Sequence, residues 1–187
     1  MNTTDMNQKV IRMSKMLGVI LLTYGSLLAQ DLPGGEVVTK GMMSNNVSVP
    51  EVFTMSSSFQ RIVIVRLKYQ KDILEGIEEA VEREGIKNGV ILSGVGSVIR
   101  YHLHAVDNAV FPSELVFWEK NDPMDITSMN GYIIDGRVHA HMTLANDETA
   151  IGGHIEPRTK VFTFCIITIA EVSDETSLHR MDDKTWR

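Results

Sequence analysis

The chain has 187 residues, of which 43% are hydrophobic and 22% charged, and its formal net charge is −6. This length and composition are typical of one globular domain that can bury a hydrophobic core, with short extensions. The single cysteine excludes a disulfide within the chain and a cysteine-rich zinc site. The acidic charge disfavours nucleic-acid partners, because their phosphates attract basic surfaces.

Residues 1–29 have the pattern of a secretory signal segment. Three basic residues precede an apolar stretch over 16–29, which is shorter than the roughly 20 residues that a transmembrane helix needs. We expect cleavage after Ala29, although Leu27 occupies a position where a small residue is usual. The expected product is periplasmic or secreted and has no membrane association. The alternatives are an uncleaved N-terminal anchor and a buried helix.

The next segments lead from an arm into a folded domain. Residues 30–58 contain Gly, Pro, Ser and Asn clusters with little periodicity, which predicts a linker or arm. Residues 61–67 are β-branched and apolar on both faces, which predicts a strand covered on both sides. Residues 72–84 have apolar side chains at helical spacing, with Asp72 placed to cap the helix and Gly85 to end it.

Two further strands are predicted over 89–92 and 97–106, joined by a tight junction at 93–96. The Gly-x-Gly in this junction is too short for a dinucleotide-binding fingerprint, and a strand follows it in place of the required helix. His102 and His104 lie on the polar face of the second strand. We interpret them as ordinary polar-face histidines; the alternative is that they extend a metal site or form a second one.

The remaining elements complete a strand-rich domain. Residues 114–119 and 124–134 are predicted strands, and 161–172 is the most apolar run of the domain, as expected of a central strand. Cys165 lies within that run, so we expect an unreactive core thiol. Residues 173–187 are predicted to be a polar, frayed tail.

The stretch from Gly131 to Ile155 carries the strongest functional signal. Apolar and polar side chains alternate strictly over 137–144, which predicts a strand with one core face. His139 and His141 lie two residues apart on the polar face and therefore point the same way.

A third histidine follows after a predicted turn at Asn146-Asp147. It belongs to the sequence Gly152-Gly153-His154, in which the two glycines allow the backbone to approach another segment closely. If this segment folds back as a hairpin, His154 meets the other two histidines. Three converging imidazoles are the ligands of a transition-metal site, with Zn²⁺ the first expectation and other divalent transition metals possible. The alternative is a pair of solvated histidines followed by an ordinary glycine turn.

Several short motifs occur in a characteristic order. They are Ser93-Gly94-Val95-Gly96-Ser97, Asp125-Ile126-Thr127-Ser128-Met129-Asn130-Gly131, Asp135-Gly136-x-x-His139-x-His141, Gly152-Gly153-His154-Ile155 and Ile169-Ala170-Glu171-Val172. This order resembles the plants and prokaryotes conserved (PPC) domain over about residues 59–172, in the form that stands alone in bacteria. Asp125 occupies a position where Glu is commoner in the family, and Met129 one where Leu is commoner.

One helix and several antiparallel strands predict an α+β fold, mainly an antiparallel sheet with a single covering helix. Such a sheet leaves much of its second face open, which favours oligomerisation, and the resemblance implies a homotrimer. The predicted division is a signal peptide over 1–29, a linker or arm over 30–58, a PPC-like domain over 59–172 and a polar tail over 173–187.

The expected function is metal binding through His139, His141 and His154. Zinc held by three histidines keeps one position for water, whose pKa it lowers to about 7. A structural metal, hydrolytic chemistry and small-ligand binding in subunit clefts therefore all remain open, and so does the question of whether the chain is an enzyme. We find no nucleophile arrangement, phosphate loop or acid–base pair at a suitable spacing.

The alternative function is DNA binding, which the plant members of the family suggest because their domain accompanies AT-hook segments. The chain has no Arg-Gly-Arg-Pro hook and no basic run in the domain. Residues 1–29 hold three basic groups and one acidic group, so the chain without them has 15 basic and 23 acidic groups and a net charge of −8. Such a surface disfavours duplex DNA.

Overall fold

The computed structural model describes residues 49–109 and 113–182, which lie in one compact unit. The predicted signal segment 1–29 and most of the predicted arm fall outside the described residues. No helix in the described part of the chain is long and apolar enough to cross a membrane. The elements in chain order are β1 (Phe59–Leu67), α2 (Ile73–Glu84), β2 (Gly89–Val106), β3 (Leu115–Lys120), β4 (Met124–Ile134), β5 (Arg137–Ala145), β6 (Ala150–Ile155), β7 (Lys160–Val172) and the 3-10 helix η1 (His179–Asp182).

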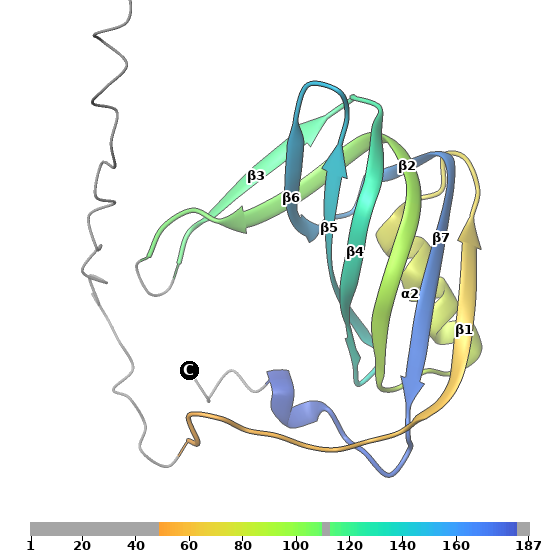
Figure 1. Cartoon of the computed structure of the whole chain (residues 1–187), viewed down its shortest axis with the longest axis vertical. Helices are drawn as coiled ribbons and strands as arrows, with labels where there is room; N and C mark the ends of the chain where they lie inside the picture. The colour runs from red at the N-terminus through yellow and green to blue at the C-terminus, as the bar shows by residue number, and fades with distance from the viewer. Residues whose placement is uncertain (1–48, 110–112, 183–187) are drawn as a thin grey trace, which may run out of the picture. The chain divides into compact units, whose positions relative to one another are not determined.

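The strands form one antiparallel sheet in the order β1-β7-β2-β4-β5-β6. The long strand β2 pairs with four others, because its second half also contacts β3 and the end of β6. Figure 1 shows β2 and β3 leaving the rest of the sheet together as an arm, while α2 lies behind β2 and β7. The prediction of an α+β fold with a mainly antiparallel sheet and one helix is confirmed.

Helix α2 begins and ends where the sequence predicts. The Asp72 side chain accepts a hydrogen bond from the backbone N–H of Glu75 at 3.3 Å, which caps the first turn. Gly85 ends the helix in the left-handed conformation with φ 69°. The apolar stripe of the helix, including Ile73 and Ile77, is fully buried against the sheet.

The hydrophobic core lies between α2 and the sheet, and β7 contributes a row of buried side chains to it. Alternate residues of β7, including Ile167 and Ile169, are fully buried. Cys165 is buried in the same row, and burial raises the pKa of its thiol to about 12. The predicted core thiol is therefore confirmed.

Two strand predictions are wrong. The expected junction at residues 93–96 lies inside the continuous strand β2, with irregular pairing to β7 in its place. Gly96 is needed there because a Cβ would lie 2.0 Å from the carbonyl oxygen of Phe164 in β7. The strand predicted to be covered on both faces is β1 at the sheet edge, where Ile62 and Ile64 are 51% and 71% exposed.

The tail prediction also fails for the residues that the structure describes. Residues 173–182 return to the domain and end in η1, and Leu178 is buried beside Ile134 and Val172. Nδ1 of His179 lies 2.7 Å from Oδ2 of Asp135 in the turn between β4 and β5. An apolar residue within a polar segment was the signal that sequence reasoning passed over.

Candidate metal centre

Strand β5 presents the first two histidines as its alternation predicts. Ala140, Met142 and Leu144 are buried, whereas His139 and His141 lie on the opposite, exposed side. Their Nε2 atoms are 3.3 Å apart, and the two rings are stacked with centroids 5.3 Å apart. Because both side chains extend from one strand of the sheet, their separation is set by the pleat.

Strand β6 brings the third histidine to the same place. The β5–β6 hairpin turns at Asn146, whose side-chain oxygen accepts the backbone N–H groups of Glu148 and Thr149 at 3.0 and 2.9 Å. The resulting register sets His154 opposite His141. The ring of His154 lies 4.7 Å from that of His139 and 5.2 Å from that of His141, measured between centroids.

The two glycines before His154 have different neighbours. A Cβ on Gly153 would lie 2.5 Å from the carbonyl oxygen of His104, because β6 runs against β2 at this point. A Cβ on Gly152 would meet its nearest atom, the carbonyl oxygen of Met142, at 3.2 Å. Gly153 therefore permits the close approach of two strands that carries His154 into the cluster.

The three sequence-predicted histidines form one potential ligand group. One ring nitrogen from each of His139, His141 and His154 lies within 4.8 Å of the others. Burial, and after it the electrostatic effect of the neighbouring histidines, lowers the pKa of His154 to about 4. Burial, followed by the same electrostatic effect, lowers the pKa of His141. Both rings are accordingly neutral at pH 7 and can offer a lone pair to a metal.

A second group shares His154, and it agrees for His104 with the alternative of a further site rather than with the preferred interpretation of ordinary polar-face histidines. His104 lies opposite His154 in the β2–β6 pairing, and the centroids of the two rings are 4.6 Å apart. Nδ1 of His104 is 2.6 Å from Oε1 of Glu156, and the three residues together could hold an ion. The alternation of β2 placed His104 on the polar face, but nothing local predicted its pairing with β6. His102 belongs to neither group and contacts the carbonyl oxygen of Pro157 at 3.0 Å.

A cavity of about 700 Å³ borders the cluster. His139 and His154 form part of its wall, and Arg137 and Asp182 form another part, joined by an ion pair of 3.2 Å. The remaining wall is largely apolar and includes Leu178 from the returning tail. This volume is in the range of small-molecule sites, so a ligand of that size can approach the histidines.

The family model for the Plants and Prokaryotes Conserved domain, abbreviated PCC or PPC, matches residues 54–173. The chain belongs to this family. The resemblance seen in the motif order is thus confirmed, and the matched range contains all the residues of both histidine groups.

Solved structures agree with this PPC assignment. The chain is 28% identical to a metal-containing protein from Archaeoglobus fulgidus, with a TM-score of 0.58 over 65% of this chain and 86% of that one. It is 25% identical to a PPC protein from Pyrococcus horikoshii, with a TM-score of 0.57 over 67% and 87%. A protein from Salmonella enterica has 19% identity and a TM-score of 0.55 over 63% and 81%, which shows a shared fold alone.

Two curated relatives are larger proteins. Both are named bifunctional protein GlmU, from Synechococcus strains JA-2-3B'a(2-13) and JA-3-3Ab, and they are 25% and 22% identical over 144 and 136 residues. The matched segments are 76% and 72% of this chain and 21% of each relative. The PPC chain therefore spans about a fifth of the length of these relatives.

Proposed function

We propose that this PPC protein binds a divalent transition metal, zinc in the first instance, through His139, His141 and His154. The observation that carries the proposal is the convergence of three ring nitrogens within 4.8 Å of one another. A tetrahedral zinc with nitrogen ligands at about 2.0–2.1 Å needs those nitrogens about 3.3–3.4 Å apart. The 3.3 Å separation between Nε2 of His139 and Nε2 of His141 matches that requirement.

The chemistry of the donors supports the same proposal. A metal competes with protons for imidazole nitrogen, so ligands with lowered pKa values bind it with less competition near neutral pH. His154 and His141 both have lowered pKa values. The metal-containing relative from Archaeoglobus fulgidus, at 28% identity, provides independent support for a metal in this fold.

The surroundings favour a metal that small molecules can reach over a purely structural one. Structural zinc sites are closed by four protein ligands, whereas His139, His141 and His154 supply three. Zinc in such a site supplies a Lewis acid and a water of pKa about 7. The chain's own residues would orient an incoming molecule: the apolar wall of the 700 Å³ cavity excludes water from its body, and Arg137 can hold a charged end.

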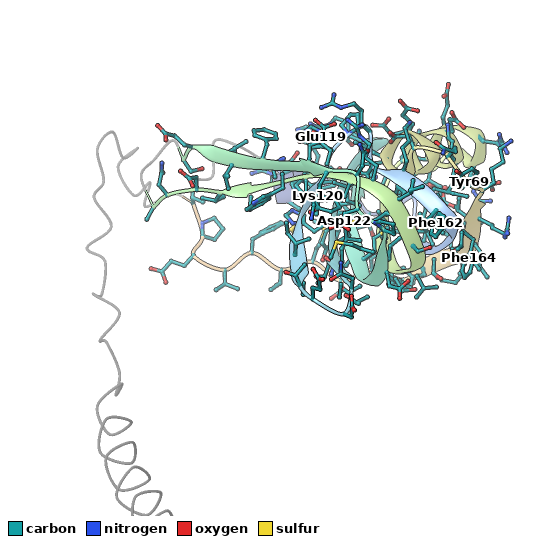
Figure 2. All side chains as sticks on the ribbon, turned by 90° about the horizontal axis from the view of Figure 1, so that it is seen from above. Tyr69, Glu119, Lys120, Asp122, Phe162 and Phe164 are labelled. Atoms are coloured by element: carbon teal, nitrogen blue, oxygen red, sulfur yellow. The ribbon has the colours of Figure 1, made fainter. Side chains whose placement is uncertain are left out.

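We further propose that the protein assembles as a homotrimer through the sheet face opposite α2. Ile62, Ile64 and Val95 are each more than half exposed on β1 and β2, and Phe162 and Phe164 of β7 are 39% and 38% exposed. Figure 2 shows the two phenylalanines near one another on the same side of the protein. A contiguous apolar surface of this kind is typical of a protein–protein interface, and further copies of the same chain are its simplest occupants.

The metal proposal is tested by measuring metal per chain after gel filtration. We expect about one zinc per wild-type chain, and none in His154→Ala or His141→Ala. His179→Ala is the matched control, since His179 is a histidine of the same fold that contacts Asp135 and belongs to neither ligand group. A His154→Ala protein that keeps its full complement of zinc would overturn the proposal.

A further inference from the structure

A second polar site lies at the base of the β2–β3 arm, away from the three proposed ligands. It is a hollow of about 490 Å³, here called the basic hollow, whose wall consists of Gln70, Ile99, Arg100, Asn121, Arg158 and Lys160. Figure 2 labels Glu119, which lies on β3 where the arm joins the domain and contacts Arg100 and Arg158 of this wall. Three cationic side chains from β2, the β6–β7 loop and β7 therefore surround one concavity.

Glu119 holds two of the cations side by side. Its Oε1 accepts from Nη2 of Arg100 at 2.5 Å and from Nε of Arg158 at 2.6 Å, and its Oε2 accepts from Nη2 of Arg158 at 3.2 Å. Two guanidinium groups repel each other unless a carboxylate lies between them. This shared carboxylate fixes the guanidinium groups at the same edge of the hollow.

The buried carboxylate of Asp72 fixes the third cation, Lys160. Asp72 is 1% exposed, and its Oδ2 accepts from the backbone N–H of Arg158 at 2.6 Å and lies 3.2 Å from Nζ of Lys160. The basic hollow thus brings together the positive charges of Arg100, Arg158 and Lys160 and the negative charges of Glu119 and Asp72. One positive charge is left over, which favours an anion.

Two further features set Arg100 and Arg158 apart from residues of an ordinary loop. In the part of the chain that the structure describes, Nε of Arg100 is the one buried side-chain nitrogen or oxygen without a hydrogen-bond partner. Arg158 has φ 80°, a conformation that is unfavourable for residues other than glycine. An arginine held at a strained position, beside an arginine with an unused donor, is typical of a binding site rather than of an ordinary loop.

We propose that the basic hollow binds a phosphate group, either as inorganic phosphate or as the ester of a small molecule. Guanidinium groups match the oxygens of phosphate with paired donors, and a lysine adds a compact charge beside them. The volume of 490 Å³ admits a small organic phosphate as well as the free ion. No residue of the hollow belongs to either histidine group, so this site does not depend on the metal proposal.

The test is isothermal titration calorimetry of the full chain with inorganic phosphate, glycerol 3-phosphate and acetate, in a buffer without other oxyanions. We expect saturable binding of one of the two phosphates with a dissociation constant of about 1 mM or tighter. Whichever of the two phosphates binds more tightly shows whether the site prefers the free ion or a phosphate ester. Acetate should bind at least about tenfold more weakly, because it has one charge and two acceptor atoms; equal binding of acetate would overturn the phosphate assignment.

Single variants locate the site. Arg158→Gln and Lys160→Gln should each weaken phosphate binding about tenfold or more, since each removes a charge-assisted contact. Lys120→Gln is the matched control, because Lys120 also pairs with a carboxylate, Asp122 at 2.7 Å, but lies outside the wall. Circular dichroism checks that each variant is folded. If one of the two hollow variants is unfolded, the phosphate affinity of the other still tests the proposal.

Repeating the titration before and after zinc removal by a chelator separates the two sites. Binding that is unchanged by zinc removal and lost in the hollow variants supports the proposal, whatever the outcome for the histidines. Binding that disappears with zinc would assign the phosphate to the metal and overturn it. Wild-type protein that does not bind either phosphate at about 10 mM would overturn it as well.

Discussion

Replacing Gly153 with Ala tests whether the close approach of β6 to β2 positions the proposed metal ligand. The added Cβ would lie 2.5 Å from the carbonyl oxygen of His104, about 0.8 Å closer than ordinary C···O contacts. The obstructing atom belongs to the backbone of the paired strand β2, so no side-chain rotation can relieve the contact. Strand β6 must therefore move, and His154 moves with it.

The expected cost follows from two opposing effects. Overpacking of this kind costs about 1–3 kcal/mol, while the loss of glycine freedom in the unfolded chain returns about 0.4–1 kcal/mol. The free energy of unfolding should fall by about 1–2 kcal/mol, which for a domain of this size lowers Tm by about 4–7 °C. Displacement of His154 should weaken zinc binding by about 10–100-fold, as altered ligand orientation does in other metal sites.

Gly152→Ala is the matched control one residue away. Its Cβ would meet the nearest atom at 3.2 Å, so a shift of a few tenths of an ångström suffices. We expect its stability to remain within about 0.5 kcal/mol of wild type and its zinc affinity to be unchanged. Thermal unfolding of the metal-free proteins and zinc competition with a chromophoric chelator measure the two quantities. Equal behaviour of Gly153→Ala and Gly152→Ala in both assays would refute the reasoning.

Three further predictions address pH, DNA and export. Zinc should be released as the pH falls, because protons compete for the imidazole nitrogens, and the lowered pKa values of His141 and His154 should shift this release below the free histidine value of about 6.5; release already complete at pH 6.5 in equilibrium dialysis would contradict this. Duplex DNA should bind no tighter than roughly 10⁻⁴ M at physiological salt, and a salt-resistant, sequence-selective complex in a mobility-shift assay would restore the DNA-binding alternative. Mass spectrometry of protein from its native host should find a first residue at or near Gln30, and intact residues 1–29 would rule out cleavage.

The local part of the candidate site could be predicted from sequence because it depends on short-range geometry. Strict alternation over β5 was enough to set His139 and His141 on one face, since side chains of a strand alternate whatever its neighbours are. A short turn at Asn146 then fixed the register of the hairpin, and with it the place of His154 opposite His141. The three proposed ligands could therefore be named from local patterns, although the contact between Gly153 and β2 that supports His154 could not.

The grouping of His104 and Glu156 with His154 could not be predicted, because it depends on the pairing of β2 with β6. His104 meets His154 only because β2 continues past β4 and pairs with β6, about 50 residues further along the chain. The basic hollow was missed for the same reason: Arg100 of β2 and Arg158 of the β6–β7 loop are joined through Glu119 on β3. Sequence patterns report which face a side chain occupies but not which strand lies beside it.

The edge strand shows how a pattern can be read correctly and still mislead. The two-sided apolar pattern of β1 predicted cover on both faces, and Val63 and Val65 do pack against the core. Ile62 and Ile64 on the other face are exposed in the single chain. A covering partner from another copy of the chain would satisfy the pattern, so the failed prediction for one chain is itself an argument for assembly.

Metal binding should also stabilise the fold, because the proposed ligands come from two strands that meet only in the folded state. A ligand that binds the native state alone adds about 2.7 kcal/mol at a free concentration of 100 times its dissociation constant. That corresponds to a rise in Tm of about 10 °C for a domain of this size. His179→Ala should show the same rise as wild type, and His154→Ala should show none. A full rise in the His154→Ala protein would place the stabilising zinc elsewhere, since His154 is shared by both ligand groups and its loss breaks each of them.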